Sequence, residues 1–284
     1  MPPSKIPPSI RQRRLGAELR RLREQAGLSV TRAGELHGTT QSRISNIESG
    51  GYPVSADRVR ALARLYGCAD DALIEALTRM TGGRTRGWWE EYREILPAGA
   101  LDLAELEHHA RSMRIATVIH IPGVLQTSDH ARALFRDAFP PLSPPEAEHR
   151  VSHRIKRQGV LYGEPPIPLS IVIHEAALRM GVGGATVARS QYKHLIEMST
   201  CENITLRVIP FGAGAIPSSG QPIVYFSAAV PQLDTVQLDT DHGSEFLDAP
   251  TYLVKYRSIL DLMESCALGP MESRDLMSRI EQDI

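Results

Sequence analysis

Residues 38–55, GTTQSRISNIESGGYPVS, concentrate side chains that could read the edges of nucleic-acid bases. Gln and Asn can form paired hydrogen bonds with adenine, and Arg can do so with guanine. In a helix that begins after Thr40, Ile44 and Ile47 would share one face and anchor the helix to a core. Gly50 would then end the helix. The polar side chains left facing outward, which we expect to contact bases, are Gln41, Ser42, Arg43, Ser45 and Asn46.

Short helices on both sides of this segment are expected to position it. Apolar residues recur at helical spacing in five stretches, and side-chain oxygens of Ser29, Thr40 and Ser55 could cap three of the helices. The small pair Ala33-Gly34 suits a close crossing of the second and third helices. Two short helices joined by a tight turn inside a helical bundle are typical of a helix-turn-helix, whose second helix enters the DNA major groove.

The distribution of charge favours the same interpretation. Residues 1–66 contain twelve Lys and Arg and five acidic residues, whereas the whole chain has a formal net charge of −1. A basic head on an acidic body indicates that the head meets a polyanion. We expect Glu48 to pair within the bundle and not to face bases. The predicted phosphate contacts are Arg11, Arg13, Arg14, Arg32, Thr40 and Arg58.

The stretch LSVTRAGELHGTTQSRISNIESG resembles the Xre/lambdoid-repressor helix-turn-helix family. The resemblance implies specific binding to a double-stranded DNA operator. Val30 stands where that family often has a phosphate-binding Gln, so this contact is not carried over. Ala33 and Gly34 replace the family's usual Leu and Ala. The residues that fall in register without a gap are Leu28, Gly38, Gln41, Ser42, Ile44, Ser45, Ile47, Glu48 and Gly50.

Beyond this head, predicted strands alternate with predicted helices. Strands are expected at Ile115 to Ile121 and in PLSIVIH, ITLRVIPF, QPIVYFSA and DTVQLDT, and WWEEYREIL is expected to be a helix. A chain of 284 residues is long enough for two domains. We therefore predict a multi-domain protein: a disordered leader at 1–10, an all-α, five-helix helix-turn-helix domain at 11–80, a linker at 81–87, and an α/β (α+β) effector and dimerisation domain at 88–284.

Five segments of the body resemble the actinomycete antitoxin-like transcriptional regulators: HIPGVLQTSDHARAL, RIKRQGVL, HEAALRM, QYKHL and ITLRVIPFGAG. That resemblance implies a regulator that is often encoded beside a small acidic partner protein, which can antagonise it. It supplies neither a ligand nor a catalytic residue.

Three alternatives remain open for the body: a ligand-responsive sensor and dimerisation domain, a module that binds a small partner protein, and an enzyme. HEAALRM is not HExxH, and neither a G-x-S-x-G elbow nor a complete dinucleotide loop is present, so we do not expect catalysis. A pocket for a small-molecule effector could form at the loop-like stretches PGVLQT and PFGAGAIPSSG. Arg154 and Arg157 could hold an anion there, although a charged helix face has the same composition. The candidate pocket residues are His120, Gln126, Arg154, Arg157 and Gln158.

Composition sets further bounds. Cys68, Cys201 and Cys266 are far apart and form no CxxC, so we expect reduced thiols and neither a zinc site nor a cofactor. No run of ~18 apolar residues and no signal peptide is present, which predicts a cytoplasmic protein that is nucleoid-associated when bound to DNA. Because helix-turn-helix proteins usually read two half-sites symmetrically, we expect a homodimer.

Overall fold

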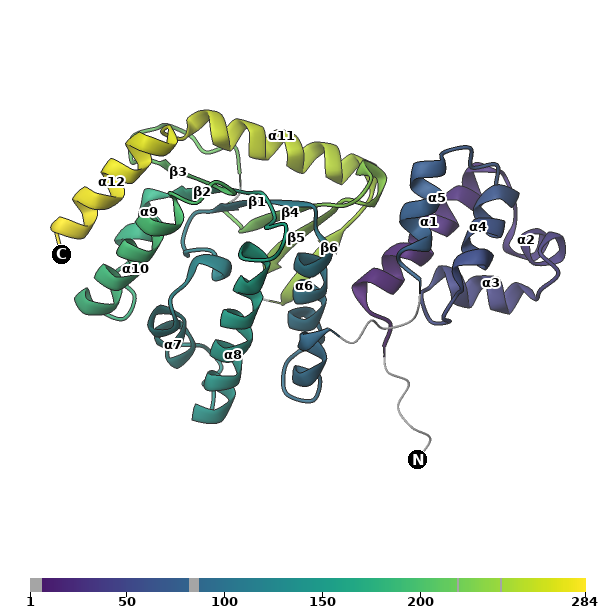
Figure 1. Ribbon diagram of the computed structural model, residues 1–284, viewed down its shortest axis with the longest axis horizontal. Helices are drawn as coiled ribbons and strands as arrows, with labels where there is room; N and C mark the ends of the chain where they lie inside the picture. The colour runs from purple at the N-terminus through teal and green to yellow at the C-terminus, as the bar shows by residue number, and fades with distance from the viewer. Residues whose placement is uncertain (1–6, 82–86, 219, 241) are drawn as a thin grey trace. The chain divides into compact units, whose positions relative to one another are not determined.

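The computed structural model describes residues 7–81, 87–218, 220–240 and 242–284 (Figure 1). Residue contacts divide the chain into two compact units: Met1–Glu90 with Ala229–Leu233, and Glu91–Ala228 with Asp234–Ile284. Residues 82–86 of the predicted linker and residues 1–6 of the predicted leader lie outside the described residues. The helical head begins before the predicted residue 11, because Ser9 caps a helix whose first residue is Ile10.

The first unit contains a bundle of five short helices that begin at defined residues. In each helix the side chain before the first turn accepts a hydrogen bond from the backbone amide three residues later; these caps are Ser9, Ser29, Thr40, Ser55 and Asp70. The predicted five-helix head is therefore confirmed. The helices are α1 (Ile10–Gln25), α2 (Val30–Leu36), α3 (Gln41–Glu48), α4 (Ala56–Leu65) and α5 (Asp71–Thr78).

The second unit is built on a six-stranded sheet in the order β3-β2-β1-β4-β5-β6. The first three strands are parallel to one another, and β4, β5 and β6 each pair antiparallel with the strand before them in that order. The strands are β1 (Ser112–Thr117), β2 (Leu169–His174), β3 (Ile204–Ile209), β4 (Ile223–Ser227), β5 (Thr235–Thr240) and β6 (Gly243–Leu247).

Helices cover both faces of this sheet (Figure 1). Successive strand residues point to opposite faces, so Met113 and Ile115 enter one core and Ala116 enters the other. The core on one face is completed by α11 (Pro250–Cys266). On the other face lie α6 (Ala98–His109), α7 (Ser128–Arg136), α8 (Pro144–Arg157), α9 (Glu175–Arg179), α10 (Ala185–Met198) and α12 (Pro270–Gln282). The predicted α/β body is confirmed.

Two local predictions need correction, and one strand was not predicted. The expected helix WWEEYREIL is only a 3-10 helix, η1 (Trp88–Tyr92), followed by a turn. The expected strand at Ile115 to Ile121 ends at Thr117, because the chain leaves the sheet and enters a second 3-10 helix, η2 (Gly123–Leu125), at Pro122. The sequence reading also missed β6, whose GSEFL is half polar because it is an edge strand paired only with β5.

Candidate nucleic-acid interface and ligand site

Helix α3 has one buried face and one exposed polar face. Ile44 is 1% exposed and Ile47 is 2% exposed, so these two side chains anchor the helix to the bundle. Four of the five predicted base-reading residues are exposed: Gln41, Ser42, Ser45 and Asn46. Polar groups near the start of the second helix of the motif are those that meet base edges in a helix-turn-helix complex.

Arg43, the fifth predicted base-reading residue, is half-buried against Tyr52. Its Nη2 donates a hydrogen bond to the Tyr52 hydroxyl at 3.0 Å, and its guanidinium lies 4.6 Å from the centre of that ring. Tyr52 therefore holds the Arg43 guanidinium through both its hydroxyl and its ring. Sequence reasoning did not single out Tyr52, although an aromatic residue directly after the glycines that end α3 was a usable signal.

Helix α3 packs closely against α1. A buried ion pair joins the two helices, and a glycine in α1 leaves room for the backbone of α3. Arg23 Nε lies 2.6 Å from Glu48 Oε1 and its Nη2 lies 3.0 Å from Oε2, with both side chains 6% exposed. The prediction that Glu48 pairs within the bundle is confirmed. A Cβ at Gly16 would lie 2.4 Å from the Glu48 carbonyl oxygen, so only glycine permits this approach of the two helices.

Arg14 does not fit its predicted role as a phosphate contact. It is 5% exposed, and its Nη1 donates to Glu18 Oε2 at 3.4 Å; Glu18 itself is 1% exposed. Leu15 and Leu19 are on the face of α1 that points into the bundle. Arg14 and Glu18 are four residues apart, so helical spacing places both side chains beside that buried face.

The other predicted phosphate contacts lie nearer the surface, and several have protein partners. Arg11 Nη2 donates to the Arg79 carbonyl and Arg13 Nη1 to the Pro8 carbonyl, each at 2.6 Å. Exposed Arg32 pairs with Glu35 at 3.0 Å. The two remaining predicted residues are Thr40 and Arg58. Thr40 caps α3. Arg58 lies near His37, and the pKa of His37 is lowered mainly by burial and also by the charge of Arg58.

In the second unit, the five predicted pocket residues come together around the loop that joins β1 to α7. Gln126, which is 2% exposed, accepts from Arg154 Nη1 through its Oε1 at 2.6 Å. Its backbone carbonyl accepts from Gln158 Nε2 at 2.6 Å. His120, in the same loop, is near enough to Arg154 for that arginine to lower its pKa, with desolvation as the larger cause.

The fifth predicted residue, Arg157, forms a two-point ion pair that sequence reasoning did not assign. Its Nε and Nη2 lie 2.7 and 2.6 Å from the carboxylate oxygens of Glu107, which is 2% exposed. Gly123 lies directly against both arginines, because a Cβ there would be 3.4 Å from Arg154 Nε and 3.5 Å from Arg157 Nη1. The two guanidiniums therefore converge on one point of the loop.

Two further side chains that the sequence reading missed hold or flank this loop. Gln191 of α10 is fully buried; its Nε2 donates to the Leu125 carbonyl at 2.7 Å, and its Oε1 accepts from the Thr127 amide at 2.8 Å. His130 of α7 is 4% exposed, and burial, followed by the charge of Arg154, lowers its pKa to about 4. Both residues lie in segments that resemble the antitoxin-like regulators, Gln191 in QYKHL and His130 in SDHARAL, and this position was the sequence signal that could have identified them.

Desolvation also acts on Arg154 itself. Although part of the residue reaches solvent, burial of its guanidinium and then the charge of Arg157 lower its pKa to about 9. The carboxylates of Asp239 and Glu107 oppose this shift through space. Its guanidinium lies 4.4 Å from the ring centre of Phe135. The cluster thus contains two cations but only one carboxylate in direct contact with them within the described part of the chain.

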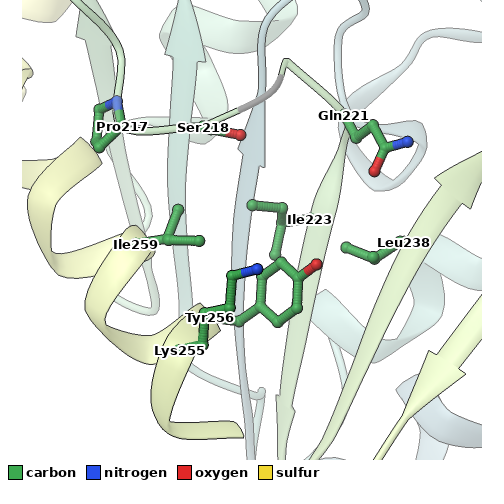
Figure 2. Close-up of a pocket in the computed structure, with 8 residues that line it drawn as sticks. All are labelled: Pro217, Ser218, Gln221, Ile223, Leu238, Lys255, Tyr256 and Ile259. Atoms are coloured by element: carbon green, nitrogen blue, oxygen red, sulfur yellow. The ribbon is translucent and has the colours of Figure 1, made fainter. Parts of the chain in front are cut away.

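A separate pocket of about 270 Å³ lies on the opposite face of the sheet, against α11. Figure 2 shows Ile223, Leu238 and Ile259 on its apolar side, with Lys255 and Tyr256 projecting from α11. Its remaining lining residues are Pro217, Ser218 and Gln221. Pro217 and Ser218 come from PFGAGAIPSSG, one of the two stretches expected to form a pocket, but none of the five predicted pocket residues lines it.

Among residues 7–81, 87–218, 220–240 and 242–284, no group of three or more His, Cys, Asp or Glu side chains could hold a metal ion. No helix within those ranges is long and apolar enough to cross a membrane.

The five-helix unit with its exposed α3 defines a helix-turn-helix protein of the DNA-binding regulator class. Residues 14–77 match the family described as a helix-turn-helix domain. Residues 100–279 match the family described as a domain of unknown function, DUF5753. Because this second match covers more than half of the chain, the protein belongs to the DUF5753 family. No curated protein and no solved structure matches the chain.

Proposed function

We propose that this protein is a sequence-specific transcriptional regulator that binds a double-stranded DNA operator as a homodimer. Its helix-turn-helix is of the Xre type, and its DUF5753 body is a non-catalytic domain that dimerises and responds to a small ligand. One observation carries the DNA-binding part of the proposal: α3 exposes Gln41, Ser42, Ser45 and Asn46 while Ile44 and Ile47 fix it to the bundle.

The body's proposed role follows from what a helix-turn-helix head requires. A symmetric protein reads two half-sites at a fixed spacing, so a ligand that alters the dimer changes operator affinity. The buried polar cluster around Gln126, Arg154 and Arg157 supports the ligand part, because specific sites contain a few convergent polar groups on otherwise packed elements. The pocket beside α11 contains none of these three residues.

The first experiment is selection of genomic DNA fragments by the purified protein, followed by titration of the best fragment at two salt concentrations. We expect a palindromic site and a slope of log K against log salt of about −0.9 per phosphate contact. Gln41→Ala and Asn46→Ala should each weaken binding to that site by about 1–3 kcal/mol and change binding to random DNA little. Gln25→Ala, at an exposed position at the end of α1, is the matched control.

Two results would contradict the DNA-binding proposal. Equal losses on specific and random DNA for Gln41→Ala and Asn46→Ala would show that these side chains contact only phosphate. Weak binding of the wild-type protein to every fragment would show that the head does not recognise an operator on its own.

A second candidate function is that of an antitoxin-like module whose main role is to bind a small acidic partner protein, with DNA binding for autoregulation. Exposed apolar side chains on the last two helices favour it: Val254 is 61% exposed, Leu262 is 53% exposed and Met271 is 74% exposed. Replacing Leu262 and Met271 by Ser should abolish co-purification with a small acidic protein encoded next to the gene. Unchanged co-purification would reject this surface as the contact.

A further inference from the structure

The two arginines of the body site present unused hydrogen-bond donors toward one point. Of the Arg154 nitrogens, Nη1 donates to Gln126, while Nε and Nη2 donate to no residue within the described ranges. Arg157 uses Nε and Nη2 for Glu107, which leaves Nη1. Arg154 Nε and Arg157 Nη1 are the two nitrogens that lie 3.4 and 3.5 Å from the position a Cβ would take at Gly123.

The charges at this point do not balance. Glu107 neutralises Arg157 through a two-point contact, whereas Arg154 contacts the neutral Gln126 oxygen and the Phe135 ring. Asp239, exposed at the end of β5, acts on Arg154 only through space. A desolvated cation without a carboxylate in contact costs stability, and an anion placed against it removes that cost.

Two other buried polar atoms of the second unit also lack partners. His130 Nδ1 and Thr117 Oγ1 each belong to a residue that is 4% exposed, and neither atom has a hydrogen-bond partner among the described residues. Thr117 is the last residue of β1, and His130 is near enough to Arg154 to feel its charge. Buried polar atoms are usually paired, so the unpaired His130 Nδ1 near the Arg154 cation supports a missing ligand at this point.

The position in the sheet suits a ligand. The chain runs from β1 outward to β2 and β3, and then returns to place β4 on the other side of β1. The carboxyl ends of the parallel strands β1, β2 and β3 lie at one edge of the sheet, which is where ligands bind in sheets of parallel strands. The loop 118–127 leaves β1 at that end and contains both Gly123 and Gln126.

We propose that this site binds the oxyanion of a small ligand, a phosphoryl or carboxylate group held over Gly123 by Arg154 and Arg157. The planar guanidinium forks suit the two or more oxygens of such a group. The inference rests on the proposed ligand-sensing function of the body and names the chemical class of its ligand. Gly123 matters because any side chain there occupies the space where the oxyanion would meet both arginines.

The test uses the full-length protein with inorganic phosphate and, in a second arm, acetate, each titrated by calorimetry. We expect saturable binding of at least one anion at one site per chain. Arg154→Gln should lower its affinity at least tenfold. Gly123→Ala should do the same while leaving both arginines in place, since its Cβ would be in ordinary contact with Arg154 and Gly123 does not adopt a positive φ.

Arg132→Gln is the matched control, because Arg132 lies on the neighbouring helix α7 and its ion pairs with Asp129 and Glu148 are at the surface. It should bind the anion as the wild type does. Preference for phosphate or for acetate assigns the source of the oxyanion. Absence of binding of both anions, or equal affinity in the wild type, Arg154→Gln and Gly123→Ala, would overturn the oxyanion site.

Operator binding measured on the same proteins separates this inference from the function on which it rests. Intact operator binding with no anion binding rejects the oxyanion site and leaves the DNA-binding regulator standing. Anion binding that depends on Arg154 and Gly123 but does not change operator affinity supports the site and rejects its role as the sensor input.

Discussion

Replacing Arg23 by Met is expected to loosen helix α3 more than any exposed charge change in the same bundle. Arg23 forms two hydrogen bonds with Glu48 and a third, from its Nη1, with the Leu28 carbonyl at 2.7 Å. Both members of the ion pair are 6% exposed. Removing one partner of a buried pair leaves the other charge unpaired, at a cost of about 3–5 kcal/mol.

Amide hydrogen exchange measured by peptide is the appropriate assay, because it reports the opening free energy of α1 and α3 separately from that of the sheet. Arg20→Met provides the control, since Arg20 pairs with Glu24 at 2.7 Å on the same helix but with side chains 63% and 51% exposed. Exposed pairs of this kind contribute little. The double replacement Arg23→Met with Glu48→Met should recover much of the lost stability, because no unpaired charge then remains.

The exchange rates of α3 in the Arg23→Met protein and in the double replacement test whether the buried ion pair holds the helix. If α3 exchanges at the wild-type rate in Arg23→Met, the buried pair does not hold the helix. If the double replacement is no more stable than Arg23→Met alone, then the loss comes from missing packing or from the Leu28 contact and not from an unpaired Glu48.

Two other predictions concern packing and pH. Gly16→Ala puts a Cβ 2.4 Å from the Glu48 carbonyl, so we expect a loss of about 1–3 kcal/mol in urea unfolding and weaker operator binding, whereas Gly99→Ala in α6, with no atom nearer than 3.8 Å, should not destabilise. Burial lowers the pKa of His130 to about 4 and of His153 to about 3, so the unfolded chain takes up protons first as the pH falls from about 6.5. The second unit should therefore be most stable above pH 6.5 and lose roughly 2 kcal/mol per imidazole by pH 5, as measured by hydrogen exchange at both pH values; a flat profile would refute the neutral, buried imidazoles.

Much of the head could be predicted because its signals are local. A serine, threonine or aspartate that caps a helix is followed within one turn by the amide it binds, and Ile44 and Ile47 share a face by spacing alone. The position of Arg43 was not predictable in this way. Whether it faces the solvent or Tyr52 depends on how the chain turns after Gly50, and helical spacing does not encode that turn.

In the body site, too, local signals predicted some of the residues and not others. Polar residues in a loop and on the helix after it indicated Gln126 and Arg154, but no local rule pairs them. Glu107 and Gln191 reach the site from helices before and after it in the chain, and the packing of α6 and α10 on the same face of the sheet brings these helices together. An ion pair across fifty residues and a buried glutamine that holds two backbone groups are results of tertiary packing, so a single sequence does not reveal them.

A sensor needs a group whose interaction energy differs between the empty and the occupied state, since a ligand shifts an equilibrium only by its differential affinity. Arg154 meets this requirement, because its charge is desolvated and has no carboxylate in direct contact within the described residues. Gln126 and Gln191 bind the backbone of the same loop, from Ile121 to Thr127, and so join it to α8 and α10. An oxyanion that draws Arg154 away from the Gln126 oxygen would therefore act on α8. Through the loop it would also act on α10, so that a change of charge at one point would alter the packing of two helices of the body.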